Sequence, residues 1–427
     1  MKTHDRWGVA LIAPDETVAQ RFDEAVRELC LMRGQPSQTL GEGKASSNQC
    51  VLVEVFESYL NLYAQTSEGN QQARDRIAGA QAAHGSHEGR ERAHLEAAAH
   101  WSIGELDRAV ATLRLWIEKE PRDLLALRIA QDLAFFLGDQ DSLLGIPEGA
   151  LGAWKDQELE RGLVLGMVAF GLEEKGHYRQ AEEYARDALT RDPTDPWSTH
   201  ALAHVMEMEG RSTEGAAFLR SSAPHWSPSF FASHNWWHLA LFLVEIDDFD
   251  GAVELLHGPI SAPGHEAWFE IVNQASLLWR LGLLDVDPGP PAPGLLQVLK
   301  ERTGESLSIF NSLHAVAALS LGGDTDAVEE ILATYEALDD GGPGLDLLQG
   351  FSEFARAKWS DAALRLGNAR SSARSIGGST AQRDLIDQTL LLSLCRSGGS
   401  QELIKEVVAS HPSRWSPATT ERLLASH

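Results

Sequence analysis

Cysteine is scarce in this chain, and its three copies stand far apart. Cys30, Cys50 and Cys395 form no CxxC pair, whereas a disulfide framework or a thiolate zinc site requires several cysteines at short, regular spacings. The sequence therefore indicates neither kind of site, and it favours a reducing compartment.

Basic side chains are also few. The chain has 36 Lys and Arg against 62 Asp and Glu, which gives a formal net charge of −26. A chain of this charge repels the phosphates of nucleic acids and the surfaces of anionic bilayers. We therefore expect no nucleic-acid partner and no membrane partner.

Long hydrophobic runs are missing as well. Beyond the N-terminus the longest apolar run is Leu239–Val244 with its two preceding tryptophans, which is far short of the roughly 20 residues that a membrane-spanning helix needs. The run Trp7–Ala13 is followed by Pro14, Asp15 and Glu16, where a signal peptide requires small residues. These features predict a cytoplasmic protein.

Several catalytic motifs are absent from the sequence. It contains no P-loop, no G-x-G-x-x-G after an expected strand and no G-x-S-x-G elbow. A phosphate-cradling loop, a dinucleotide site and an α/β-hydrolase site are therefore not predicted. Whether the protein is an enzyme stays open.

The sequence does contain a repeat, with a period of 34 to 40 residues. Amphipathic segments end at a turn residue and a second such segment follows. The successive turn residues are 34, 38, 34, 37, 35, 40, 37 and 39 positions apart. They are Gly104, Gly138, Gly176, Gly210, Asp247, Gly282, Gly322, Trp359 and Gly398. This is the period expected of tetratricopeptide-type helical hairpins.

The clearest hairpin half reads G-H-Y-R-Q-A-E-E-Y-A-R-D-A-L-T-R-D-P, residues 176–193. Ala181, Ala185 and Ala188 keep one face of its helix thin, and Pro193 ends it. One such hairpin cannot bury its apolar stripe alone, whereas stacked neighbours form a continuous core.

The start of the next helix carries its own signal. Asp195 before Pro196 predicts an N-cap followed by a first-turn proline. A helix is therefore expected to begin there and to continue through the stretch that contains the first histidine pair described below.

The predicted fold is an all-α, tetratricopeptide-like solenoid that forms a right-handed superhelix. Residues 91–427 are expected to hold about eight hairpins, and residues 1–90 to form an N-terminal helical cap. Within the cap, 17–32 and 51–63 are predicted helices and 34–49 a polar loop.

Two further stretches are predicted to lack regular structure. The stretch 285–294 is rich in proline and is expected to connect two hairpins over the surface. The stretch H-G-S-H at 84–87 lies among Ala, Gln and Gly, and it is a predicted solvated linker.

Four separate stretches resemble the tetratricopeptide repeat protein 38 family. They are D-P-T-D-P-W-S-T-H-A-L-A-H-V-M-E-M (192–208), H-N-W-W-H-L-A-L-F (234–242), I-F-N-S-L-H-A (309–315) and G-G-S-T-A-Q-R-D (377–384). They occur in the family's order. The resemblance implies an all-helical repeat protein of the cell interior, and it implies no particular reaction.

Two successive hairpins carry histidine pairs four residues apart. His200 and His204 fall at positions 5 and 9 of one hairpin, and His234 and His238 at positions 2 and 6 of the next. Residues at i and i+4 lie on one side of a helix, and these positions face the inside of the superhelix. Glu207 continues the face beyond His204. We expect the four imidazoles and Glu207 to converge on a concave pocket and to be the catalytic residues if a reaction takes place.

Three interpretations of these imidazoles stay open. They could hold a transition metal, but no carboxylate stands at a recognised spacing such as H-E-x-x-H, so a metal is not favoured and the cofactor is unknown. They could satisfy one another and Glu207 inside a half-dry interior. They could also bind a small polar molecule and act on it as acid and base, because imidazole titrates near neutral pH.

Further residues are predicted to line the same groove as ligand-binding groups. Trp236 sits where the repeat favours a core tryptophan, and Trp237 is a candidate groove wall. Asn273 takes the place of His238 in the following hairpin. The remaining candidates are Asn235, Asn311, His314, Asp384 and Gln388. For Asn311 and His314, structural hydrogen bonding is the favoured alternative.

The stretch G-G-S-T-A-Q-R-D contains a predicted capping box, in which Ser379 and Gln382 satisfy the free amides of a helix start. Arg383 and Asp384 are expected to form a local ion pair. Alternatively, Arg383 clamps an anionic ligand, because its guanidinium matches a carboxylate or phosphate.

Two functions remain at this point. One is a pocket for a small polar, even anionic, molecule. The other is a scaffold that binds a protein or peptide in the groove without catalysis, which fold analogy favours. The clustered histidines favour the small molecule.

Overall fold

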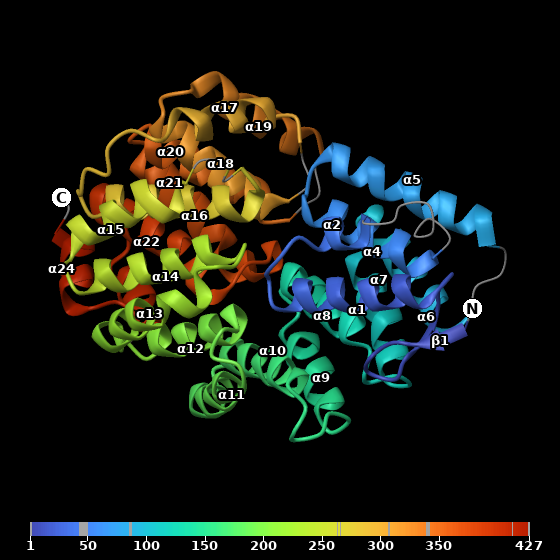
Figure 1. Cartoon of the computed structure of the whole chain (residues 1–427). Coiled ribbons are helices and arrows are strands. Elements are labelled where there is room, and N and C mark those ends of the chain that lie inside the picture. Colours follow the sequence, from blue (N-terminus) through green and yellow to red (C-terminus); the bar gives the residue numbers. More distant parts are fainter. Residues whose placement is uncertain are drawn as a thin grey trace. The chain divides into compact units, whose positions relative to one another are not determined.

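The computed structural model describes residues 2–41, 50–84, 88–262, 264, 266–305, 308–338, 342–411 and 413–425. The chain divides into two compact units (Figure 1). The N-terminal unit comprises residues 1–202 and 224–231, and the C-terminal unit comprises residues 203–223 and 232–427.

The N-terminal unit begins with a short antiparallel hairpin, in which Thr3 pairs with Leu11, and continues with helices. Its strands are β1 (Lys2–His4) and β2 (Ala10–Ile12). Its helices are α1 (Glu16–Cys30), α2 (Pro36–Gly41), α4 (Val51–Tyr63), α5 (Ser67–His84), α6 (Gly89–Ser102), α7 (Leu106–Ile117), α8 (Leu124–Leu137), α9 (Gln140–Leu151), α10 (Glu160–Glu174) and α11 (Tyr178–Arg191).

Two helices cross the division between the units, namely α12 (Pro196–Met208) and α13 (Ser212–Trp226). The C-terminal unit then holds α14 (Ala232–Glu245), α15 (Phe249–Leu255), the π-helix η1 (Leu256–Ile260), α16 (Trp268–Leu283), α17 (Pro293–Glu301), α18 (Ile309–Leu321), α19 (Thr325–Leu338), α20 (Gly344–Ala355), α21 (Trp359–Ala369), the 3₁₀-helix η2 (Arg370–Ile376), α22 (Thr380–Ser397), α23 (Gln401–Ala409) and α24 (Pro417–Ala425).

Consecutive helices pack as hairpins, as the period predicts. Pairs such as α6 with α7, α10 with α11, and α20 with α21 lie against each other. The turns between paired helices contain a residue with positive φ. Six are the predicted ones: Gly104, Gly138, Gly176, Gly210, Asp247 and Gly398. The all-α, tetratricopeptide-like fold is therefore confirmed.

Three predicted turn residues are displaced by one to three positions. The left-handed residues are Asp285, Gly323 and Ala357, and the predicted ones were Gly282, Gly322 and Trp359. The sequence of α16 continues through position 282, and α21 begins at position 359. A turn needs one residue that tolerates positive φ, and a local pattern does not fix which neighbour adopts it.

The expected elements of the first 90 residues are partly observed. The predicted helices at 17–32 and 51–63 correspond to α1 and α4. The predicted loop at 34–49 is wrong in its first part, because α2 occupies 36–41, and 42–49 lie outside the described residues. The sequence gives no sign of the hairpin of β1 and β2.

The division into a cap of residues 1–90 and a repeat array from residue 91 stays a prediction. One hydrophobic core of the N-terminal unit runs from Trp7 to Met167 and includes residues on both sides of position 90. The connection before α17 lacks regular structure from Val286 to Ala292, whereas the last two residues of the predicted stretch 285–294 belong to α17. Of the predicted linker 84–87, residues 85–87 lie outside the described residues.

A buried ion network ties the N-terminal core together. The side chains of Arg90, Asp5, Asp123 and His94 are 0% exposed. Arg90 donates from Nη1 to Asp5 Oδ2 over 2.7 Å and from Nη2 to Asp123 Oδ1 over 2.8 Å. Asp123 also caps α8 by accepting from the backbone N–H of Ala126. The single guanidinium thus bridges two carboxylates that have no access to water.

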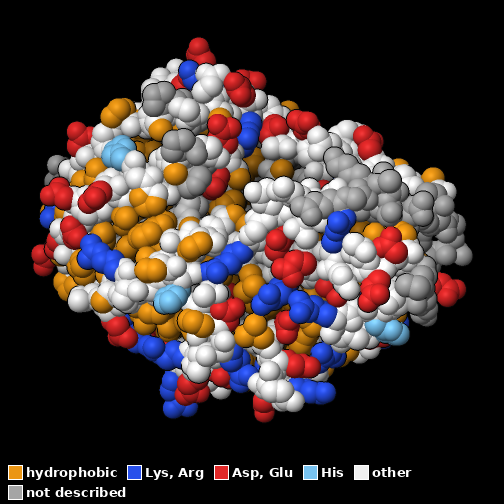
Figure 2. Space-filling model, viewed as in Figure 1, with side chains coloured by type: hydrophobic (Ala, Val, Ile, Leu, Met, Phe, Trp, Pro, Cys, Tyr) orange, Lys and Arg blue, Asp and Glu red, His pale blue; other side chains and the backbone are white. Residues whose placement is uncertain are grey.

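The described helices include none that is long and apolar enough to cross a bilayer. On the face drawn in Figure 2, acidic and basic side chains are interspersed.

Candidate functional site

The histidine pairs lie on α12 and α14, and local sequence determines how α12 begins. Asp195 accepts a hydrogen bond from the backbone N–H of Trp197 over 2.9 Å, and Pro196 is the first helical residue. The predicted helix start is therefore confirmed. The four-residue spacing then places both histidines of each pair on one side of its helix.

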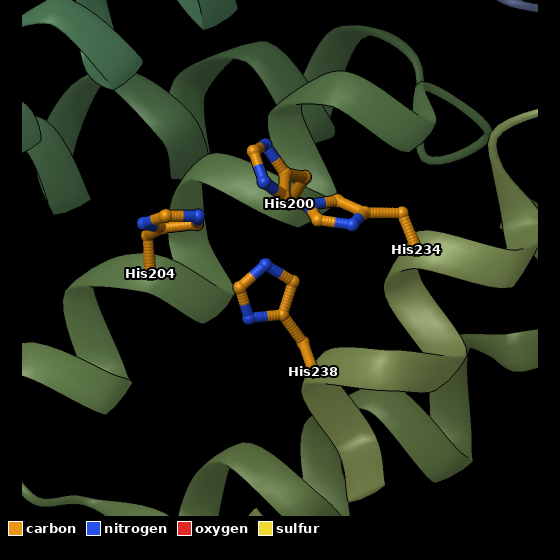
Figure 3. A group of neighbouring side chains, drawn as sticks. All are labelled: His200, His204, His234 and His238. Carbon is orange, nitrogen blue, oxygen red and sulfur yellow. The ribbon is translucent and has the colours of Figure 1, made fainter. Parts of the chain in front are cut away.

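Three of the imidazoles meet inside the C-terminal unit. His204 comes from α12, and His234 and His238 come from α14. In Figure 3 their rings lie near one another, and one nitrogen of each lies within 4.8 Å of the others. The ring centroids of His204 and His238 are 4.6 Å apart, and those of His234 and His238 are 4.8 Å apart. We call these three residues the imidazole cluster.

The imidazole cluster is buried rather than exposed on a groove wall. The exposed fractions of its members are 0% for His204 and His238 and 7% for His234. Contact with bulk water is therefore minimal, and any group that reaches the cluster must be small or enclosed.

Two hydrogen bonds orient the histidines of α14. Nδ1 of His238 lies 2.9 Å from Oε2 of Glu207 and donates to it when Glu207 is ionised, because an ionised carboxylate can only accept. Nδ1 of His234 donates to Oδ1 of Asn273 over 2.8 Å, and the Asn273 amide in turn donates to Ser233 over 3.4 Å. With the hydrogen on Nδ1, the lone pair of each neutral ring is on Nε2.

Burial controls the charge of these groups. Desolvation lowers the pKa of His234 and His238 well below 6.5, and the neighbouring imidazoles add to the effect. Desolvation raises the pKa of Glu207, and His204 opposes this shift. At neutral pH both α14 imidazoles are therefore uncharged.

His200 stands one turn before His204 on α12 and is drawn with the cluster in Figure 3. Within the N-terminal unit its ring packs among three aromatic rings. The centroid distances are 5.2 Å to Phe170, 5.0 Å to Trp197 and 5.2 Å to Phe231. This aromatic packing holds the His200 ring in place within the N-terminal unit.

The burial of the two tryptophans of α14 differs from the prediction. Trp237, the predicted groove wall, is fully buried and stacks on the His234 ring. The ring centroids are 5.1 Å apart, and the interplanar angle is 12°. Trp236, the predicted core residue, is only half-buried. Asn235 is buried with Trp237.

Two further predicted ligand residues lie on α18. His314 donates from Nδ1 to the carbonyl of Phe310 over 2.8 Å, and burial lowers its pKa to about 4. Asn311 is buried. The hydrogen bond of His314 is local to its own helix, in agreement with the structural alternative.

The predicted ion pair between Arg383 and Asp384 stays a prediction. Arg383 donates to the carbonyls of Gly377 and Gly378 just before α22. Neighbouring side chains leave a helix in different directions, so Asp384 points into the unit interior while Arg383 folds back onto the start of its own helix.

The capping box of α22 is present as predicted. The Ser379 hydroxyl accepts from the backbone N–H of Gln382 over 3.2 Å, and the Gln382 side chain accepts from the backbone N–H of Ser379 over 2.9 Å. These two bonds satisfy amides that a helix start leaves without partners. They explain the sequence of this stretch without a ligand.

Asp384 is the centre of a buried network in the C-terminal unit. It accepts from Arg280 Nη1 over 3.2 Å, from Trp415 Nε1 over 2.8 Å, and also from Arg414. His411 Nε2 lies 3.0 Å from Oδ1 of the same carboxylate. Desolvation would raise the pKa of Asp384, but Arg414, His411 and Arg280 together hold it far below its usual range.

Sequence reasoning found only two members of this network. Gln388, a predicted ligand residue, donates to Asp384 Oδ2 over 2.8 Å. The other partners come from α16 and from the segment before α24, and no spacing in the sequence connects them with α22. Only the tertiary packing reveals them.

Two cavities adjoin this network. The smaller, of about 20 Å³, is lined by Glu207, Asp384, Gln388, Arg280, Arg414 and Glu245, among others, and it has room for a water molecule. The larger, of about 600 Å³, shares Glu245 and Arg414 with it. Its hydroxyl-bearing lining residues are Ser212, Thr213, Ser413, Ser416 and Thr420. The larger volume is that of a small-molecule site.

Glu245, which lines both cavities, makes the stability of the protein depend on pH. Burial raises its pKa to about 7, and the backbone N–H of Ser416 and the hydroxyl of Thr419 oppose the shift. Because the folded-state pKa is raised, the folded protein holds this proton more tightly than the unfolded chain does. The resulting stabilisation is complete below about pH 4.3, where unfolded glutamate titrates, and is lost as pH rises through about 7.

We therefore expect Glu245→Gln to protect the protein at high pH. Between about pH 5 and pH 8 the wild type should lose on the order of 2 to 3 kcal/mol that the variant keeps, because Gln stays neutral and can still accept from Ser416. Urea unfolding at the two pH values measures the difference. An equal pH dependence for both proteins would contradict the assignment.

These features define an all-α protein of tetratricopeptide-like helical hairpins with a buried histidine cluster. No model of a known protein family matches the sequence. A tetratricopeptide repeat protein from Parabacteroides merdae ATCC 43184 is similar in structure, with 15% identity and a TM-score of 0.37 over 71% of this chain and 98% of that chain.

Two complexes of human IFIT1 are also similar in structure. The IFIT1 dimer with PPP-AAAA has 12% identity and a TM-score of 0.43 over 96% of this chain and 94% of that chain. The dimer with m7Gppp-AAAA has 12% identity and a TM-score of 0.38 over 98% of this chain and 96% of that chain. At such values the likeness says nothing about ligands.

Proposed function

We propose that the protein binds a small polar molecule in the larger cavity of its C-terminal unit. The observation that carries the proposal is the continuity of polar groups from the imidazole cluster to this cavity. Glu207 accepts from His238 and lines the smaller cavity, which shares Arg414 and Glu245 with the larger one. A cavity of this size with a few convergent polar groups is the usual form of a ligand site.

Arg414 favours a ligand that carries a hydrogen-bond acceptor. It lines both cavities, and among the described residues its buried Nε–H has no hydrogen-bond partner. A buried donor without a partner is costly, so a carboxylate or carbonyl oxygen placed there would gain a favourable contact. The hydroxyls of the lining add donors and acceptors for the rest of the molecule. Small organic acids and amino acids fit this description.

The alternative is a scaffold that binds a peptide in an open groove. A scaffold would present its recognition residues on an accessible face. Of the groove residues predicted from sequence, His204, His238, Asn273 and His314 are fully buried. Because these groups are buried, they present no recognition surface to a peptide.

Filling the cavity tests the proposal. Thr420, a half-buried residue of α24, lines it, so Thr420→Trp should occupy the volume. We expect a panel of small carboxylates, amino acids and polyols to contain a compound that raises the melting temperature of the wild type and leaves that of Thr420→Trp unchanged. Thr334→Trp, which alters a half-buried threonine on α19 outside both cavities, is the matched control and should respond as the wild type does.

Arg414→Lys tests the role of the guanidinium. Lysine keeps a positive charge beside Asp384 but lacks the Nε–H, so binding of the active compound should weaken about tenfold. The proposal fails if no compound in the panel stabilises the wild type, or if the stabilisation survives in Thr420→Trp.

We also propose that the chain is a member of the tetratricopeptide repeat protein 38 family. The four ordered stretches support this assignment, and they lie on α12, α14, α18 and the start of α22. An alignment of members would test it, because they should share the histidines of α12 and α14 as well as the capping box of α22.

A further inference from the structure

We propose that the imidazole cluster is a binding site for a divalent transition-metal ion of the Zn²⁺ or Co²⁺ kind. His204, His234 and His238 bring one nitrogen each within 4.8 Å of the others. Zn–N bonds are about 2.0 to 2.1 Å long, so an ion among the three rings requires only small ring movements. Three histidines with an open fourth position form the ligand set of a catalytic zinc site.

The outer hydrogen bonds match those of a metal site. Histidines that bind metals commonly donate their second ring N–H to a carboxylate or carbonyl, which orients the ring and selects its tautomer. His238 donates to Glu207 in this way, and His234 donates to the amide oxygen of Asn273. Ser233 in turn accepts from Asn273 and holds the amide in place.

The sequence argues against a metal site because no carboxylate stands at an H-E-x-x-H spacing. The contacts of Glu207 and Asn273 supply the outer partners without that spacing. Glu207 is three residues beyond His204 on α12, and its carboxylate accepts from a histidine of the neighbouring helix. Asn273 is 35 residues beyond His238, on α16. Only the packing of α12, α14 and α16 brings these outer partners to the rings.

The charges around the cluster can accommodate a dication. Glu207 is buried and lies directly against His238, so its carboxylate supplies a nearby negative charge when it is ionised. Arg280 is a positive group that acts on His238, but its guanidinium is paired with Asp384 over 3.2 Å. The site does not depend on the larger cavity, whose lining residues include none of the three histidines.

Measuring metal binding distinguishes a metal site from a cluster with a purely structural role. Protein without an affinity tag should be unfolded in chelator and refolded with one equivalent of Co²⁺ or Zn²⁺, which removes any barrier to entry into a buried site. We expect one bound ion per chain by elemental analysis, and a Co²⁺ visible spectrum of tetrahedral type. His204→Phe keeps the ring volume but removes one ligand, so its affinity should fall by about 100-fold or more with unchanged helicity.

Two more variants complete the test. Glu207→Gln should weaken binding about 10- to 100-fold, which is the usual effect of losing an outer carboxylate. His177→Ala removes an exposed histidine at the start of α11 and should leave the stoichiometry at one ion. The proposal is overturned if the refolded wild type retains no stoichiometric ion, or if His204→Phe binds as tightly as the wild type. Neither result would alter the response of the larger cavity to Thr420→Trp.

Discussion

Replacing Arg90 by Met should destabilise the N-terminal unit by about 3 to 5 kcal/mol. The change leaves Asp5 and Asp123 fully buried without their shared cation, and methionine fills the volume without supplying charge. Urea unfolding followed by circular dichroism measures the loss.

The contribution of Asp123 to the pH dependence of stability has a definite sign. Desolvation would raise the pKa of Asp123, but Arg90 and His94 hold it far below its usual range. A depressed folded-state pKa stabilises the protein above about pH 3.9, where an unfolded aspartate titrates, and the stabilisation is lost as pH falls further. Arg90→Met should weaken this dependence.

Arg92→Met on the same helix is the matched control. Among the described residues, Arg92 pairs only with Glu96, and the pair is exposed. Exposed pairs contribute little to stability, so the unfolding curve of this variant should match that of the wild type. Similar losses for Arg90→Met and Arg92→Met would contradict the role given to the buried network.

Replacing Asp384 by Ala should have an effect of the same size in the C-terminal unit, about 3 to 5 kcal/mol. Arg280 and Arg414 would both be left buried without their common carboxylate. The expected result is a lower unfolding midpoint and, because Arg414 lines the larger cavity, loss of the response to any compound bound there. Because Arg414, His411 and Arg280 depress the pKa of Asp384 despite desolvation, its stabilisation is also lost as pH falls below about 3.9.

Asp387→Ala is the matched control on the same helix. The Asp387 side chain keeps 18% exposure, and its partner Arg370 also pairs with Glu406. Its other partner, His411, keeps its contact with Asp384, so the loss of the Asp387 carboxylate leaves neither group without a partner. Its replacement should therefore cost clearly less than that of Asp384. Equal losses of stability for the two variants would contradict a larger stabilising contribution from the buried network.

Local patterns in the sequence are sufficient for much of the fold. The hairpin period, the start of α12 at Asp195 and Pro196, and the capping box at Ser379 each depend on residues a few positions apart. The short elements escape prediction, because β1, β2 and α2 have only 3, 3 and 6 residues, too few for a periodic pattern.

The candidate site is also predictable only in part, because local patterns do not show which distant residues meet. The spacing of the histidine pairs places them on two helix faces, and their meeting follows from adjacent hairpins. The partners of Asp384 are beyond such reasoning, because Arg280 is 104 residues away along the chain and only tertiary packing joins them. The repeat frame also does not predict that Trp237 is more deeply buried than Trp236.

A metal ion bound by the imidazole cluster can be observed directly by crystallography. Its presence or absence decides whether the cluster is a binding site or an ordinary part of the core. Crystals of protein refolded with one equivalent of Zn²⁺, measured on both sides of the zinc absorption edge, provide the test. We predict one anomalous peak about 2.0 to 2.1 Å from nitrogens of His204, His234 and His238. A map without a peak among these rings, with their hydrogen bonds to Glu207 and Asn273 unchanged, would contradict a binding role for the cluster.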